Sequence, residues 1–287
     1  MSRRYSRLVH TVFPALLAIG AAALMALGTV IRQRASQQGG KITGWWYLGA
    51  GTAFGGLLLQ AVALSLGAVL LVQPLIVLSV LFTLPVEKWL AKRDPSAREW
   101  IWGVLLAVGV SVFIGFTTPV PAKIGPHRWV LILVVALLLA ALAALVVFAE
   151  RSPRAPRALV YGIVSGSLFG IVAVLIHSVG RYFSHPGHLL SHTGLYLIIV
   201  VGLAAVYCQQ RAFTAGNLQA SFPAMTVAEP VVSMILGLAL LGEKLNRHSW
   251  ATVIGLVGLA LMIVGVVRLS QLTAKDLKRV DAEPARQ

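Results

Sequence analysis

The sequence contains nine aspartates and glutamates, and one of them, Glu229, lies deep within a long apolar segment. An ionised carboxylate at the centre of a bilayer costs about 2.5 to 3.5 kcal/mol on insertion scales. Such a residue is therefore protonated, paired or turned toward a wet cavity, where it can take up and release a proton. The structural alternative is a protonated glutamate that hydrogen-bonds across a helix interface.

Prolines flank this acid. Pro230 follows it directly and Pro223 lies seven residues earlier, so both fall on nearly the same face of a helix. Because proline has no N–H group, Pro230 would leave the carbonyl of Thr226 without its usual donor. Pro74, preceded by the amide of Gln73, would interrupt a second helix. Broken helices of this kind form transporter sites, although proline can also produce a simple kink.

Two other polar residues lie well inside apolar segments, Gln60 and His177, and we expect them to line the same cavity. Each could instead form a hydrogen bond between helices, which is the commoner role. Gln209 and Gln210 lie near the predicted end of a segment and are interpreted as interfacial.

Three histidines, His185, His188 and His192, share one loop at a spacing compatible with a metal site. No acid or cysteine accompanies them, so a solvated loop is favoured, and the presence of a metal site stays open.

Glycines recur at the four-residue spacing that lets membrane helices approach closely. These predicted packing positions are Gly51 and Gly55, then Gly162, Gly166 and Gly170.

The composition identifies the elements that must hold these residues. Of the 287 residues, 58% are apolar and 11% are charged, a ratio that a soluble protein could not use to cover its core. The net charge of +15 lies in short breaks between apolar runs, which predicts contact with an anionic bilayer and not with nucleic acid. The single cysteine excludes an intramolecular disulfide framework and any Cys-based zinc site.

About 20 apolar residues cross a bilayer, and cutting the chain at charges, prolines and Gly/Ser clusters predicts an all-α polytopic protein with nine spans. They are 8–31, 44–66, 67–90, 100–116, 128–149, 158–181, 193–213, 216–240 and 249–269. The second and third spans must be separated by a turn at Ser65–Gly67, because one helix over 44–90 would be about 70 Å long.

Lysines and arginines concentrate in alternate loops and in the C-terminal tail. The positive-inside rule then predicts a multi-pass protein of the plasma membrane with its N-terminus outside and its C-terminus in the cytoplasm.

The chain also resembles itself at an offset of about 150 residues. Residues 63–67 match 212–216, Pro74 matches Pro223, and Trp100 matches Trp250. Spans one to four then correspond to spans six to nine, and the unpaired fifth span inverts the second copy. We therefore predict a first repeat over residues 1–127, a linking span over 128–149, an inverted second repeat over 150–270 and a basic tail over 271–287. Inverted repeats are typical of secondary transporters, although a duplication can also be retained for packing alone.

The second copy resembles the drug/metabolite transporter superfamily of the EamA type. The resemblance rests on PAMTVAEP at 223–230 and on LGEKL at 241–245, which is similar to the "LGE" helix end of that family. It implies two inverted repeats in a ten-helix bundle and a transport function. Within the superfamily, the first half is most similar to NIPA-type magnesium transporters, through its basic loop at 32–41, its tryptophans at 45–46 and VQPL at 72–75.

An enzyme is disfavoured because no cluster of acids exists, and the one candidate phosphate loop, Gly39–Ile42, lacks a hydroxyl residue after Lys41. No cofactor is expected. A non-transporting membrane partner remains an alternative, and a homodimer is compatible with the sequence.

Two substrate classes then compete. The resemblance to NIPA-type proteins implies Mg²⁺, which prefers oxygen ligands. A single deep carboxylate is a thin site for a divalent ion, so we favour a small metabolite or drug-like solute that is moved by alternating access. In this model Glu229 would exchange the proton that drives transport.

Overall fold

The structure is a computed structural model that describes residues 11–37, 44–91, 94–117, 128–180, 192–214, 218–241 and 249–282. These residues form α-helices joined by short connections, with no strand among them. The helices are α2 (Phe13–Gln37), α3 (Gly44–Leu66), α4 (Val69–Val77), α5 (Ser79–Ala91), α6 (Ala97–Thr117), α7 (Arg128–Glu150), α8 (Arg154–Gly180), α10 (Thr193–Thr214), α11 (Leu218–Leu240) and α12 (Ser249–Ala282).

Within the described residues, nine helical segments are long and apolar enough to cross a membrane, because α4 and α5 together make one span. This confirms the expected all-helical, multi-pass membrane protein. Most helices begin and end within a few residues of the spans predicted from hydropathy, but α2 continues past Ile31 to Gln37, and α12 continues past Leu269 to Ala282, through most of the predicted tail. The first predicted residues, from Leu8, lie outside the described part of the chain.

The turn predicted at residues 65–67 is also present. Helix α3 ends at Leu66, the N–H of Gly67 donates to the carbonyl of Ala63 at 2.8 Å, and α4 begins at Val69. Ala68, with extended backbone angles of φ −66° and ψ 142°, reverses the chain direction.

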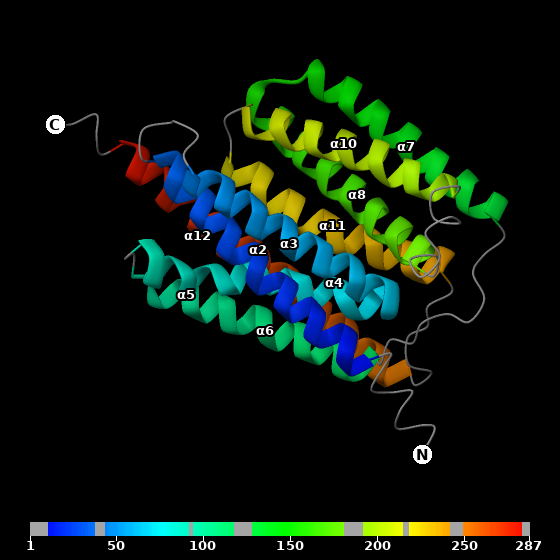
Figure 1. Cartoon of the computed structure of the whole chain (residues 1–287), viewed down its shortest axis with the longest axis horizontal. Helices are drawn as coiled ribbons and strands as arrows, with labels where there is room; N and C mark the ends of the chain where they lie inside the picture. The colour runs from blue at the N-terminus through cyan, green and yellow to red at the C-terminus, as the bar shows by residue number, and fades with distance from the viewer. Residues whose placement is uncertain are drawn as a thin grey trace. The chain divides into compact units, whose positions relative to one another are not determined.

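The chain divides into two compact units. Unit 1 comprises Met1–Pro121 and Leu245–Gly265, and unit 2 comprises Ala122–Lys244 and Val266–Gln287. In unit 1, α2 packs against α3, α4 and α5 (Figure 1). In unit 2, α8 packs against α7, α10 and α11, so each unit is organised around one helix.

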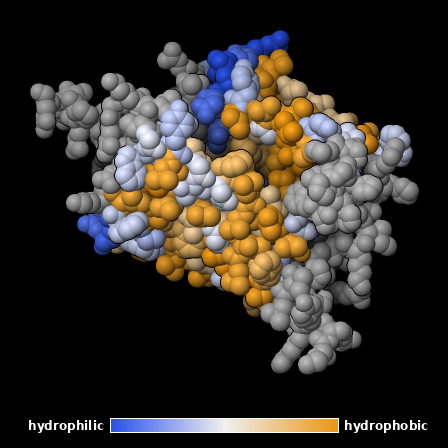
Figure 2. All heavy atoms as spheres, viewed as in Figure 1, coloured by the Kyte–Doolittle hydropathy of each residue, from blue (hydrophilic) through white to orange (hydrophobic). Residues whose placement is uncertain are grey.

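Large apolar side chains cover much of the outside of the helices, as Figure 2 shows for one face. On α7, Leu133, Leu137 and Phe148 are 60%, 62% and 61% exposed. Exposure of this much apolar surface is unfavourable in water but not in lipid, so these helix faces are compatible with contact with a membrane.

Candidate functional site

Glu229 lies at the midpoint of α11 and is half-buried. Pro230 and Pro223 are both buried, and Thr226 is half-buried like the acid. The structure therefore places the predicted carboxylate at the middle of a helix that packs against α8 in unit 2.

Helix α11 runs without interruption from Leu218 to Leu240, with both prolines inside it. The break expected at these prolines is therefore not present, because a helix can lose single hydrogen bonds where a neighbouring helix supports its backbone. The corresponding span of unit 1 is interrupted at Leu78, whose N–H donates to the carbonyl of Leu75 at 3.1 Å, three residues back.

Three glycines of α8 provide that support. A Cβ placed on Gly162 would lie 2.5 Å from the carbonyl oxygen of Ser221, and one on Gly170 would lie 2.7 Å from that of Glu229. Between them, a Cβ on Gly166 would collide with the carbonyl oxygen of Met225. Contacts advance by one turn on both helices together, so α8 and α11 run parallel with their backbones in direct contact.

Helix α10 joins this pair through side chains. Ser165 Oγ on α8 donates to the carbonyl of Ala205 at 3.0 Å, and Gln209 Nε2 donates to Met225 Sδ at 3.2 Å. Gln209, interpreted from the sequence as interfacial, therefore contacts α11 about one turn before the acid. These bonds connect α10 to both helices of the pair.

His177 is half-buried on α8, seven residues after Gly170 and thus on the same side of the helix. Seven residues correspond to about 10 Å along the axis. The structure therefore does not place His177 at the level of Glu229.

In unit 1, the predicted residues Gln60, Gln73 and Pro74 are all buried. Gln60 lies on α3, and the other two lie on α4, which is buried along its whole length. The three residues therefore lie on two consecutive helices of unit 1.

Gly51 and Gly55 lie differently from the prediction. Gly51 is exposed, and no described atom lies within 4 Å of a Cβ placed on either residue. The close contact between α2 and α3 is made by Gly28 and Gly56 instead. A Cβ on Gly28 would lie 2.6 Å from the carbonyl oxygen of Gly49, because the α3 face that carries Gly49 and Gly56 turns inward.

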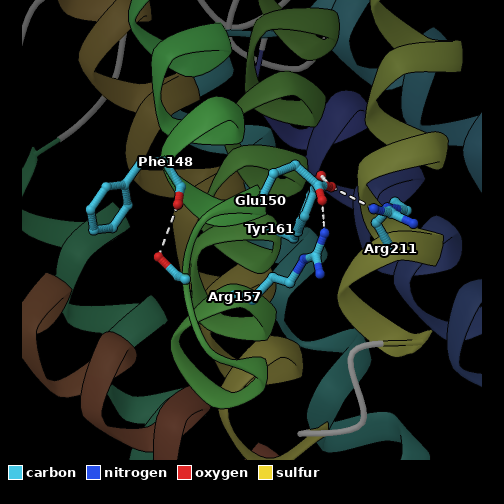
Figure 3. A network of polar contacts seen from close by, with 6 residues as sticks. Phe148, Glu150, Arg157, Tyr161 and Arg211 are labelled. Carbon is cyan, nitrogen blue, oxygen red and sulfur yellow. Dashed lines mark hydrogen bonds and ion pairs between the residues drawn. The ribbon is translucent and has the colours of Figure 1, made fainter.

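A cluster of charged residues that the sequence interpretation missed ties three helices of unit 2 together (Figure 3). The carboxylate of Glu150, at the end of α7, accepts hydrogen bonds from Tyr161 Oη and from Arg211 Nη2, the latter at 2.5 Å, and pairs with Arg157. Arg211, on α10, also lies over the Tyr161 ring at 5.8 Å. Arg157 and Tyr161 stand four residues apart on α8, a spacing that was visible in the sequence.

Two acids of unit 1 are more buried than their positions near span ends suggest. Glu87 is 4% exposed and Glu99 is 1% exposed. Glu99 forms a capping box with Ser96, whose N–H donates to Glu99 Oε2 at 2.7 Å. Burial of an acid is therefore not confined to Glu229.

No group of three histidine, cysteine or acidic side chains that could hold a metal occurs among the described residues. His185 and His188 lie outside that part of the chain, as does Glu243. His192 Nδ1 accepts a hydrogen bond from the N–H of Gly194 at 3.1 Å, a local loop contact.

Two curated proteins are similar to this chain. An uncharacterized protein of Corynebacterium glutamicum is 35% identical over 275 residues, which cover 89% of this chain and 94% of that protein. The probable magnesium transporter NIPA9 of Arabidopsis thaliana is 27% identical over 237 residues, 78% of this chain and 68% of that protein. No family model and no solved structure matches the chain.

Proposed function

We propose that this chain, which belongs to the same family as the uncharacterized Corynebacterium glutamicum protein, is a secondary transporter that moves a small metabolite or drug-like solute by alternating access. The observation that carries the proposal is the half-buried carboxylate of Glu229 at the midpoint of a membrane helix. Similarity to a protein named as a probable transporter supports transport in general over enzymatic catalysis.

In this proposal Glu229 couples proton movement to solute movement. The acid loses its proton where its side of the membrane is open to water and regains it on the other side. The backbone of α11 at Glu229 is held against α8. In this proposal the carboxylate therefore gains and loses its proton while the backbone of α11 keeps its position. A solute that competes with the proton, or requires it, is then driven by the pH gradient.

An inverted repeat is supported by the way α6 crosses the start of α12 within unit 1. At four glycines, atoms of the opposite helix lie within 3.0 Å of a Cβ placed there: Gly109, Gly255, Gly258 and Gly265. The contact covers Leu106–Thr117 of α6 and Gly255–Gly265 of α12. An offset of about 150 residues superimposes these two stretches to within two residues, as a two-fold axis between equivalent helices requires.

The test is Glu229→Gln in proteoliposomes that contain a pH-sensitive dye. Wild-type protein should dissipate a pH gradient when a transported solute from a panel of amino acids, organic acids and cationic drugs is added. The amide cannot exchange a proton, so the variant should lose this solute-dependent flux while its unfolding temperature stays unchanged. The matched control is Asp94→Asn, which alters an exposed acid paired with Lys88 at 3.2 Å. Unchanged flux in Glu229→Gln would refute the proton role.

Mg²⁺ transport is the second candidate, and the similarity to NIPA9 favours it. Mg²⁺ retains several waters when bound, so one carboxylate with backbone carbonyls could hold it. Expression in a host that depends on added Mg²⁺ distinguishes the two: growth at limiting Mg²⁺ supports this candidate, and unchanged growth supports the metabolite class.

The proposed topology places the N-terminus outside the plasma membrane and the C-terminus in the cytoplasm. Reporter fusions at Gln287 and within residues 151–157, which join α7 to the first turn of α8, should both report a cytoplasmic location. An external C-terminus would reverse the topology.

A further inference from the structure

The amide of Gln73 is the most unusual buried polar group in unit 1. The side chain is 1% exposed, and its Nε2 atom has no hydrogen-bond partner among the described residues. A buried donor without a partner destabilises the fold that contains it, so folded proteins rarely retain one without a use.

The residues around Gln73 on its own helix offer no explanation from packing. Helix α4 reads VLLVQPLIV, and all nine residues are buried. A leucine or methionine of similar volume would fill the position without a polar group. The unpartnered amide of Gln73 therefore lowers the free energy of unfolding relative to an apolar side chain at this position.

Helix α2 packs against α4 and α5 in unit 1. Helix α2 meets α3 through Ala21, Met25 and Gly28. Its next buried stripe is Ala18, Ala22 and Ala26, at 0%, 0% and 1% exposure, which leaves alanine side chains for α4 and α5. An alanine side chain has no polar atoms, so the side chains of this stripe offer no acceptor to the Gln73 amide.

A second amide lies at a matching level across the α3–α4 hairpin. Gln60 precedes the turn at Gly67 by seven residues, and Gln73 follows it by six, so each lies about 10 Å along its helix from the turn. Gln60 is 5% exposed. The segment thus carries two buried amides at similar distances from one turn.

From these observations we infer that Gln73 binds the transported solute, and that this solute presents a hydrogen-bond acceptor, a carboxylate or carbonyl oxygen, to Gln73 Nε2. The inference rests on the proposed transport function and narrows its substrate to an oxygen-bearing organic molecule. An N–H group donates to such an oxygen, whereas Mg²⁺ and cations without acceptor atoms offer Nε2 nothing to which it can donate.

The inference can be tested with the purified full-length protein in detergent, through its thermal unfolding. The probes are lactate, alanine and acetamide, which carry acceptor oxygens, and tetramethylammonium chloride and MgCl₂, which do not present them. Ionic strength is matched with NaCl. We expect at least one acceptor-bearing probe to raise the unfolding temperature by several degrees, and the other two salts to leave it unchanged.

The variant is Gln73→Leu, and the matched control is Ser270→Ala. Ser270 Oγ is likewise buried and without a partner among the described residues, but it lies on α12 beyond the unit 1 boundary. Gln73→Leu should unfold at the wild-type temperature or above it when no probe is present, and it should lose the probe-induced shift. Ser270→Ala should keep that shift.

Several results would overturn the inference. One is an unfolding temperature of Gln73→Leu, measured without any probe, that lies below the wild-type value. Another is a probe-induced rise in unfolding temperature that Gln73→Leu retains. The others concern the wild-type protein: a rise with MgCl₂ or tetramethylammonium only, or no rise with any probe. The Glu229→Gln protein should keep the Gln73-dependent shift while it loses proton flux. Failure of the inference is therefore distinguishable from failure of the proposed function.

Discussion

The two units use different helix pairs for their closest backbone contact. In unit 1 the pairs are α2 with α3, which are consecutive, antiparallel and joined through Gly28 and Gly56, and α6 with the start of α12, joined through Gly109 and Gly258. In unit 2 the pair is α8 and α11, which are parallel and separated along the chain by α10. The two units therefore differ in which helices have their backbones in direct contact.

In unit 2 the rigid contact includes the helix that carries Glu229. In unit 1 the helix that carries Gln73 packs beside alanine side chains and is interrupted at Leu78. Backbone-to-backbone contact leaves no side-chain rotamers to rearrange, whereas contact through side chains does. The comparison teaches that unit 2 holds the backbone around Glu229 through glycine contacts, whereas no glycine contact of this kind reaches the described residues of α4.

The largest expected effect tests the α8–α11 contact directly. Gly166→Ala should lower the free energy of unfolding by about 2 kcal/mol or more, because the new methyl group collides with the carbonyl of Met225 and both backbones must shift. Thermal unfolding in detergent measures it.

Gly51→Ala is its matched control in unit 1. The new methyl group meets no described atom within 4 Å, and alanine favours a helix over glycine by about 1 kcal/mol. Its unfolding temperature should stay equal or rise. Equal losses in the two variants would contradict the difference between the units.

The charged residues at span ends provide the second test. Glu150→Ala in unit 2 should cost about 1 to 2 kcal/mol, because it leaves Arg157 and Arg211 close together without a carboxylate. The cost stays moderate because the three side chains are 28% to 40% exposed. A double-mutant cycle with Arg211→Ala isolates the coupling.

For that cycle the matched pair in unit 1 is Lys88 and Asp94, with side chains 64% and 84% exposed. Asp94→Asn should change stability by less than about 0.5 kcal/mol. If the coupling energy between Glu150 and Arg211 is also below about 0.5 kcal/mol, the cluster does not stabilise the packing of α7 and α10 against α8.

The third test concerns Glu99, the acid that unit 1 holds within a single helix end. Ser96→Ala removes the capping box of α6 and should cost about 1 kcal/mol. Hydrogen exchange in the first turn of α6 should accelerate, while exchange in α10 stays unchanged. Ser96→Asp should restore most of the protection, and accelerated exchange throughout unit 1 would indicate a wider role for the box.

The spans could be predicted from the sequence because bilayer thickness sets their length, and hydropathy reads that length directly. The turn at Gly67 followed from the same constraint. The capping box was also visible, since Ser96 and Glu99 stand three residues apart before an apolar run.

Other features depend on neighbours that hydropathy does not identify. Glycine spacing alone could not decide that Gly56 faces a helix whereas Gly51 and Gly55 do not, because all three lie on an apolar segment. The continuity of α11 through Pro223 and Pro230 depends on its contact with α8. The Glu150 cluster requires α7, α8 and α10 to meet, and local sequence shows only the Arg157–Tyr161 part.

The turn between α3 and α4 has a consequence for how the chain assembles during synthesis. A Cβ on Gly67 would lie 2.6 Å from Cβ of Pro14, at the start of α2. The start of α2 is synthesised before the turn, so the turn at Gly67 docks against Pro14 only after both have been made. A side chain at position 67 would block that docking step, and we expect such a chain to be recognised by cellular quality control before α6 is inserted.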